Sequence, residues 1–388
     1  MISFHKHIAF RLSVIGLCVL TLIIATTAIV REPSSRVRTA DNAFASVPIV
    51  EDELVPEHRE APPPPPPPPL AAPAPPAPSK PKAKPQLRLP LASANMDAYR
   101  GLGTWVDVYD YAIRDTMDAE QAVDTMHAKG VRTLYLQTGR WKEPADIVKV
   151  ETVNLFLERA HLRGMKVVGW YLPGFGDIDR DIRRSLAVLQ HASPSGDRFD
   201  GLAPDIESRE ELINQIRAQH PDWSDPMVND EARIRFNAGI AEYSRRLRDA
   251  VPEATALGAI VVDAKNNERA PARWAGFPWP EIGKYYEVIV PMAYWSVTKA
   301  KGACSSVEFD TAAYMRDVVT KTQALMGAQK PMHLIGGIAD CVTANEVRGY
   351  AESMLQIGAL GGSLYDFRTI EANPARDAIW AEQARLNS

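Results

Sequence analysis

The amino-acid sequence predicts a (β/α)8 barrel, an α/β fold of the TIM-barrel type, over residues 95–388. Amphipathic helical patterns lie between most of eight apolar stretches with strand character, which is the alternation typical of parallel α/β folds. No Gly-x-Gly-x-x-Gly motif follows the first stretch, so the alternative, a doubly wound open sheet that binds a dinucleotide, lacks its fingerprint. The eight stretches are 103–108, 131–137, 166–171, 199–206, 257–262, 288–292, 333–338 and 360–365.

Helical periodicity and capping signals give the expected helices. Thr343 and Glu346 match the Ser/Thr-x-x-Glu capping box at the start of one of them. Ser208 and Glu211 match the same pattern, so a helix is expected directly after the fourth strand. The segment 264–285 reads mostly as a loop with one short helix. The helical patterns cover 119–129, 153–163, 178–190, 231–249, 312–326 and 345–356.

The first 30 residues predict a membrane anchor. A short basic stub precedes an uncharged, mostly apolar run at 12–30, whose length suits a bilayer core. Lys6 and Arg11 favour a cytoplasmic N-terminus, which predicts a single-pass protein of the cell membrane with its C-terminal domain outside the cytoplasm. The alternative is a signal peptide, with small residues at 25–28 as a cleavage site and a secreted product.

Residues 31–94 predict a disordered linker. The part from 61 to 90 is dominated by proline, with an unbroken run at 62–69. Such a segment adopts polyproline II and would span roughly 90 Å if fully extended. A spacer between a membrane and a domain in the cell envelope is the favoured interpretation, and a ligand for a proline-binding domain is the alternative.

The charge and the motif content exclude several classes of function. The net charge of −4 and the absence of a basic patch with interleaved aromatic residues predict no nucleic-acid partner. No Gly-x-Ser-x-Gly elbow, phosphate loop or His-Glu-x-x-His motif occurs in the sequence. The sequence therefore predicts no cofactor and no metal ion, and metal catalysis through carboxylates alone is the alternative that no motif requires.

The ends of the predicted strands carry carboxylates and aromatic rings. In a TIM barrel the active site is built from the residues at the C-terminal ends of the strands. Asp205 and Glu207, two residues apart on the fourth strand, would point to the same side, although one could cap the next helix and the other could face solvent. Paired carboxylates suit glycoside cleavage, and aromatic rings suit sugar faces. The candidate substrate-binding residues are Asp107, Gln137, Trp170, Tyr171, Trp295 and Asp366.

Two cysteines of the barrel fall near the same rim. Cys304 follows the sixth strand and Cys341 follows the seventh, so adjacent loops would bring them within disulfide distance. A disulfide between them fits a location outside the cytoplasm, and two free thiols are the alternative.

The fourth strand also resembles a known motif. Asp200-x-x-Ala203-x-Asp205-x-Glu207 is similar to the Asp-x-x-Asp-x-Asp-x-Glu motif of chitinase-like family 18 glycoside hydrolases, and Met292-x-Tyr294 is similar to their strand-six motif. The resemblance implies Glu207 as the general acid, Asp205 as the residue that orients an acetamido nucleophile, and Tyr294 as a supporting hydroxyl. Segments 103–110, 133–138 and 169–173 resemble a group of uncharacterised bacterial glycoside-hydrolase-like barrels.

Two functional hypotheses follow. The first is a glycoside hydrolase that acts on an envelope or other amino-sugar polysaccharide. The second is a catalytically inactive barrel that binds such a polysaccharide. Ala203 motivates the second hypothesis, because it stands where the family motif has a carboxylate.

Overall fold

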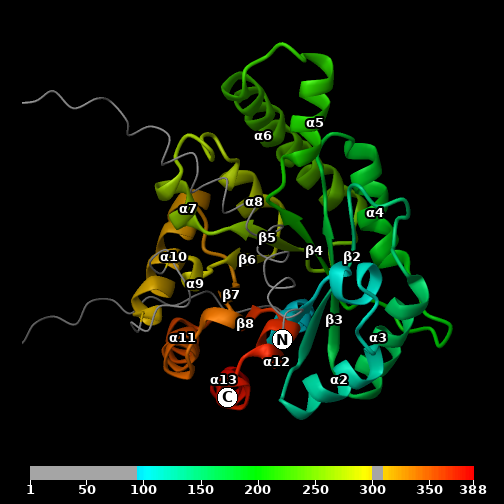
Figure 1. Cartoon of the computed structure of the whole chain (residues 1–388), viewed down its shortest axis with the longest axis vertical. Helices are drawn as coiled ribbons and strands as arrows, with labels where there is room; N and C mark the ends of the chain where they lie inside the picture. Colours follow the sequence, from blue (N-terminus) through cyan, green and yellow to red (C-terminus); the bar gives the residue numbers. More distant parts are fainter. Residues whose placement is uncertain (1–93, 299–308) are drawn as a thin grey trace, which may run out of the picture. The chain divides into compact units, whose positions relative to one another are not determined.

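The computed structural model describes residues 94–298 and 309–388. In this part of the chain eight parallel strands form a closed barrel in the order β1 to β8, which confirms the predicted fold class and excludes an open sheet. Figure 1 shows the strands surrounded by helices. The strands are β1 (Gly101–Val106), β2 (Thr133–Arg140), β3 (Lys166–Leu172), β4 (Gly201–Ile206), β5 (Gly258–Val262), β6 (Val288–Met292), β7 (His333–Ile338) and β8 (Gly361–Tyr365).

The barrel closes between its first and last strands. Gly101 of β1 pairs with Gly361 of β8 in parallel register. A Cβ atom on Gly361 would lie 2.3 Å from the backbone oxygen of Gly101, so the close approach of these strands requires glycine. The apolar stretches of the sequence therefore predict the strands well, since all are buried on both faces.

The predicted helices are present, and further ones lie between them. The Thr343 capping box forms at the start of α11 and confirms that prediction. The helices of at least six residues are α2 (Ala119–Ala128), α3 (Val150–Leu162), α4 (Ile178–Gln190), α5 (Glu210–Gln219), α6 (Asp225–Ala250), α7 (Ala264–Arg269), α8 (Trp279–Tyr285), α10 (Thr311–Met326), α11 (Ala344–Ile357), α12 (Phe367–Ala372), α13 (Arg376–Gln383) and the 3-10 helix η1 (Ala94–Tyr99).

Two local predictions are wrong. The capping box of Ser208 and Glu211 does not form, because α5 begins after Arg209 without a side-chain cap and the Glu211 carboxylate bonds elsewhere. The segment 264–285, expected to hold one short helix, contains α7 and α8. Asp263 caps α7 by accepting a hydrogen bond from the backbone N–H of Asn266.

Aromatic side chains fill the interior of the barrel on the N-terminal side of the candidate site. The hydroxyl of Tyr99, in η1, donates to the backbone oxygens of Leu202 (2.9 Å) and Ala256 (3.2 Å). The rings of Trp105 and Tyr135 stack with their centroids 4.2 Å apart. Burial lowers the pKa of His333 to about 4, so its imidazole is neutral. Because the interior is packed, chemistry is confined to the C-terminal ends of the strands.

The predicted anchor at 12–30 and the predicted linker at 31–94 lie outside the described residues, apart from position 94. None of the helices in 94–298 and 309–388 combines the length and apolar composition that a membrane crossing requires.

Candidate active site at the C-terminal ends of the strands

Side chains from neighbouring strands converge at the C-terminal end of the barrel. Gln137 of β2 pairs in register with Trp170 of β3, and Trp170 pairs with Ala203 of β4. Asp205 lies two residues beyond Ala203, so it faces the same side of the sheet. The Trp170 ring meets the buried Trp105 ring edge-on at 5.9 Å between centroids, which places Trp170 on the inner face. Asp107, two residues beyond Trp105, shares that face.

Asp205 and Glu207 form the centre of the site. Asp205 is 6% exposed, whereas Glu207, directly after β4, is half-buried. Burial, and then the charge of Glu207, raises the pKa of Asp205 well above its usual range. Burial also raises the pKa of Glu207, against an opposing effect of Arg273. Two carboxyl groups in this relation hold a proton that an exposed pair would release, and a held proton is what a general acid needs.

Buried polar atoms of the inner face without a hydrogen-bond partner in the described ranges include Oδ1 of Asp205 and the indole Nε1 of Trp170. Buried polar atoms without hydrogen-bond partners are costly and rare, so each of these two atoms calls for an explanation. A bound polar molecule that accepts from Trp170 and bonds to Asp205 would satisfy both.

Tyr294 lies in the electric field of this site. It follows β6 and is half-buried. Burial, and then the negative charges of Glu207, Asp205 and Asp366, raises its pKa well above the usual range. Its hydroxyl therefore stays protonated and is able to donate a hydrogen bond. Its ring lies 6.0 Å from the ring of Tyr365, between centroids.

Asp107 and Asp366 lie together where β1 meets β8. Asp107 accepts hydrogen bonds from the Tyr365 hydroxyl (3.0 Å) and from the backbone N–H of Tyr109 (2.8 Å). Asp366 caps α12 through the backbone N–H of Thr369. Carboxylate oxygens of Asp107, Asp110 and Asp366 lie within 4.8 Å of one another.

This acidic group offers the oxygen ligands that hard cations prefer. Arg368 and Arg114, however, already bring positive charge to Asp110, at 3.4 and 3.9 Å. We therefore treat Asp107 and Asp366 as polar residues of the rim, in keeping with their prediction as substrate contacts.

Gln137 lies at the site, but its side-chain oxygen is already bonded to the protein backbone. Its side-chain oxygen accepts from the backbone N–H of Val108 (3.0 Å), and its backbone oxygen accepts from the Tyr111 hydroxyl (2.6 Å). The side chain is 2% exposed. It supports the turn after β1, in which Asp107 lies.

The structure does not bring Tyr171 or Trp295 to the site, and their prediction as substrate contacts is wrong. Tyr171 follows Trp170, so it faces outward, and its hydroxyl donates to Asp181 of α4 (2.6 Å). Trp295 is fully buried, and a Cβ atom on Gly336 would lie 2.5 Å from its ring. Its indole N–H points to Glu346 at 3.5 Å.

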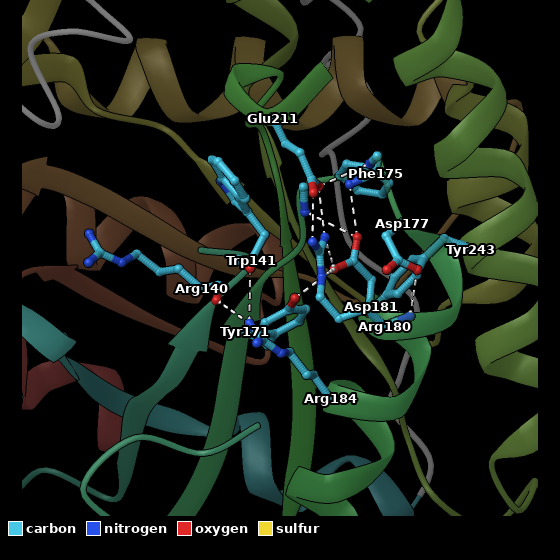
Figure 2. A network of polar contacts seen from close by, with 12 residues as sticks. Arg140, Trp141, Tyr171, Phe175, Asp177, Arg180, Asp181, Arg184, Glu211 and Tyr243 are labelled. Carbon is cyan, nitrogen blue, oxygen red and sulfur yellow. Dashed lines mark hydrogen bonds and ion pairs between the residues drawn. The ribbon is translucent and has the colours of Figure 1, made fainter. Parts of the chain in front are cut away.

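A second set of charged residues lies outside the barrel, next to β3 and β4, and the sequence does not predict it. Figure 2 shows Arg180 between the carboxylates of Asp181 and Glu211, with N–O distances of 2.8 and 2.6 Å. Asp181 also accepts from the backbone N–H groups of Gly174 (3.1 Å) and Phe175 (2.8 Å). This cluster, Arg180 with Asp181 and Glu211, fixes the connection from β3 to α4.

The predicted disulfide stays a prediction. Cys341 lies in the short helix η3 (Ala339–Cys341), directly after β7. Cys304 lies outside the described residues.

No protein-family profile matches the chain. No curated protein matches its sequence either. Among solved structures it is similar to the PgaB (BpsB) glycoside hydrolase domain from Bordetella bronchiseptica, with 15% identity, a TM-score of 0.47, and coverage of 74% of this chain and 99% of that one. A chitinase from Chromobacterium violaceum shows 14% identity, a TM-score of 0.47, and coverage of 74% and 99%. A GH18 chitinase from Cycas revoluta, solved in complex with (GlcNAc)4, shows 9% identity, a TM-score of 0.49, and coverage of 74% and 100%. Similarities at this level do not identify the reaction of this chain.

Proposed function

We propose that the barrel hydrolyses O-glycosidic bonds of an amino-sugar polysaccharide by carboxylate acid/base catalysis. The observation that carries the proposal is the pair of Asp205 and Glu207 at the end of β4, where burial raises the pKa of both carboxyl groups. A carboxylic acid that stays protonated near neutral pH is the group that glycoside cleavage requires at the leaving oxygen.

Each residue has a distinct role in this proposal. Glu207 is more exposed than Asp205 and donates its proton to the glycosidic oxygen as the bond to the anomeric carbon breaks. Asp205 accepts a hydrogen bond from the substrate's acetamido group and orients that group toward the anomeric carbon, the role that the resemblance implies. Tyr294 donates a hydrogen bond to the same group, since its raised pKa keeps the hydroxyl protonated. Trp170 supplies an indole N–H for a sugar oxygen.

We also propose, on the sequence alone, that the barrel acts in the cell envelope. Residues 12–30 would hold it at the membrane, and the proline-rich linker would let it reach a polysaccharide some distance away.

The first test replaces the proposed acid. Glu207→Gln in the full chain keeps the size of the side chain and removes the proton, so hydrolysis should fall by at least about 10²-fold. The measurement is product release from chitin oligomers and from peptidoglycan strands, with melting temperature recorded for each variant. Glu210→Gln is the matched control, because Glu210 lies three residues on, with a side chain 53% exposed.

Three outcomes are distinguishable. Loss of activity in Glu207→Gln, with normal activity in Glu210→Gln, supports the assignment. Equal activity in the wild type and in Glu207→Gln contradicts it. Retention of a glycan by the wild type without any turnover favours the alternative hypothesis, an inactive polysaccharide-binding barrel.

A further inference from the structure

Arg273, whose charge opposes the rise in the pKa of Glu207, has no role in the proposed mechanism. It lies in the connection between α7 and α8, and its side chain is half-buried. Its guanidinium carbon lies 5.3 Å from the ring centroid of Trp274, in cation–π contact. Trp274 is itself only 7% exposed, so it holds the arginine from a fixed position.

The aromatic residues beneath Arg273 connect it to the end of β4. The guanidinium of Arg209, two residues beyond Glu207, lies 5.5 Å from the same Trp274 ring. Phe277 meets that ring edge-on at 5.9 Å, and Phe236 of α6 lies 6.5 Å away, both between centroids. The position of Trp274 therefore fixes the connection between α7 and α8 over the residues that follow Glu207.

Arg273 differs in its partners from five other cations around the site. Each of those five has a carboxylate within ion-pair distance, whereas within residues 94–298 and 309–388 the guanidinium of Arg273 has neither an ion pair nor a hydrogen-bond acceptor. The paired cations and their partners are Arg140 with Glu143, Arg180 with Asp181 and Glu211, Lys265 with Asp317, Arg269 with Asp263, and Arg368 with Asp110.

The guanidinium of Arg273 also lies beyond ion-pair distance of Glu207. The shared packing of Arg273 and Arg209 on Trp274 brings it near the residues that follow Glu207, and its charge opposes the rise in the pKa of Glu207. A ligand that occupies the site beside Glu207 would then meet a fixed cation with unused N–H donors.

We propose that Arg273 selects a glycan with an oxyanion group, a carboxylate or a phosphate, on the sugar next to the bond that is cleaved. The planar guanidinium matches both groups through paired hydrogen bonds. The carboxylates of the neighbouring rim repel an anionic sugar. Such a sugar is therefore bound only where the positive charge of Arg273 offsets that repulsion. The inference rests on the proposed function and narrows its substrate class.

The test compares neutral and anionic members of one glycan series. The ligands are chitin oligomers, the same oligomers with a carboxylate or a phosphate at C6, and glycan strands whose alternate sugars carry a lactyl carboxylate. Binding to the full chain with Glu207→Gln is measured by calorimetry, so that cleavage does not interfere. At least one anionic ligand should bind about 10-fold or more tightly than its neutral parent, and which one does so separates carboxylate from phosphate.

Variants of Arg273 decide whether this residue is the cause. Arg273→Gln should abolish the preference, and Arg273→Lys should retain part of it, since the charge remains. Arg245→Gln, which removes an exposed arginine paired with Asp249 on α6, should change nothing. The preference should also weaken between low and physiological salt.

Either of two results overturns the inference: no anionic ligand binds more tightly than its neutral parent, or the preference persists in Arg273→Gln. Both are compatible with Glu207-dependent cleavage of neutral oligomers, in which case the proposed function stands. Conversely, an Arg273-dependent preference without any cleavage by the wild type would support the inference and contradict the proposed hydrolysis.

Discussion

Two pairs of buried carboxyl groups lie at the same end of the barrel, and they differ in their partners. Asp205 and Glu207 follow the inner face of β4, whereas Asp181 and Glu211 lie outside the strands on α4 and α5. Both pairs include a side chain that is almost entirely buried. Burial alone therefore does not distinguish a reactive carboxyl group from a structural one.

The outer pair is saturated with donors. Asp181 accepts hydrogen bonds from Tyr171, Arg180 and two backbone N–H groups, and Glu211 accepts from Arg180 and the backbone N–H of Gly176. Burial raises the pKa of Asp181, but the hydrogen bonds from Tyr171 and Arg180 oppose that rise. In the inner pair Asp205 lacks such compensation, because its Oδ1 has no partner in the described part of the chain. Unsatisfied burial is thus the feature that marks the inner pair for function.

The largest effect on stability is expected at Arg180. Arg180→Met removes the cation between two buried carboxylates and should lower the free energy of unfolding by about 3–5 kcal/mol. Urea unfolding at pH 7 measures the change. Arg246→Met is the matched control, since Arg246 also contacts two carboxylates, Asp179 at 2.6 Å and Glu242 at 3.3 Å, but on the surface. The control should alter stability little, and equal effects of both substitutions would remove the distinction between the two settings.

The next prediction compares the same substitution, aspartate to asparagine, in the outer and the inner pair. Asp181→Asn leaves N–H and O–H donors with a weaker, neutral partner and should lower the free energy of unfolding by about 1–3 kcal/mol. Asp205→Asn should leave stability unchanged or raise it at pH 7, because it removes a carboxyl group that is costly to ionise where it lies. The same variant should lose at least about 10²-fold in any glycan hydrolysis that the wild type shows. A large loss of stability in Asp205→Asn would mean that this residue, too, is structural.

Much of the fold could be predicted from the sequence, because its signals are local. Strands buried on both faces appear as apolar runs, and β6 (Val288–Met292) and β7 (His333–Ile338) have the predicted bounds. The sequence also shows that only one of Trp170 and Tyr171 can face the interior, since successive residues of a strand face opposite sides. The pairing of Trp170 with Gln137 in the structure shows which one it is. The same alternation places Tyr171 outside the barrel.

The remaining features depend on contacts between distant parts of the chain. Arg180 and Glu211 are 31 residues apart and meet only because α4 and α5 follow adjacent strands. The Glu211 carboxylate resembles the third residue of a capping box, but the backbone N–H of Gly176 and the guanidinium of Arg180 bind it instead. Arg273 lies in a connection without periodicity, and its place beside β4 depends on the packing of Trp274. Such positions carry no signal that a single sequence reveals.

The smallest expected effect is a pH dependence of stability. The pKa of Asp205 is raised in the folded chain, so the native state holds a proton that the unfolded chain releases above the ordinary aspartate pKa of about 3.9. The unfolded state then binds fewer protons than the native state, and the free energy of unfolding falls as pH rises through the raised pKa. Asp181 contributes a change of the same sign over a narrower range, because its hydrogen bonds hold its pKa lower.

Urea unfolding between pH 4 and pH 8 separates the two contributions. Asp205→Asn should make the decline in stability across this range less steep than in the wild type, and Asp181→Asn should reduce the slope by less. Asp222→Asn, at an exposed position before α6, should leave the slope as it is. If the free energy of unfolding declines in parallel in the wild type and in Asp205→Asn, the pKa of Asp205 in the folded chain is that of an ordinary aspartate. Burial would then not raise the pKa of Asp205, and the contrast between Asp205 and the compensated Asp181 would fail.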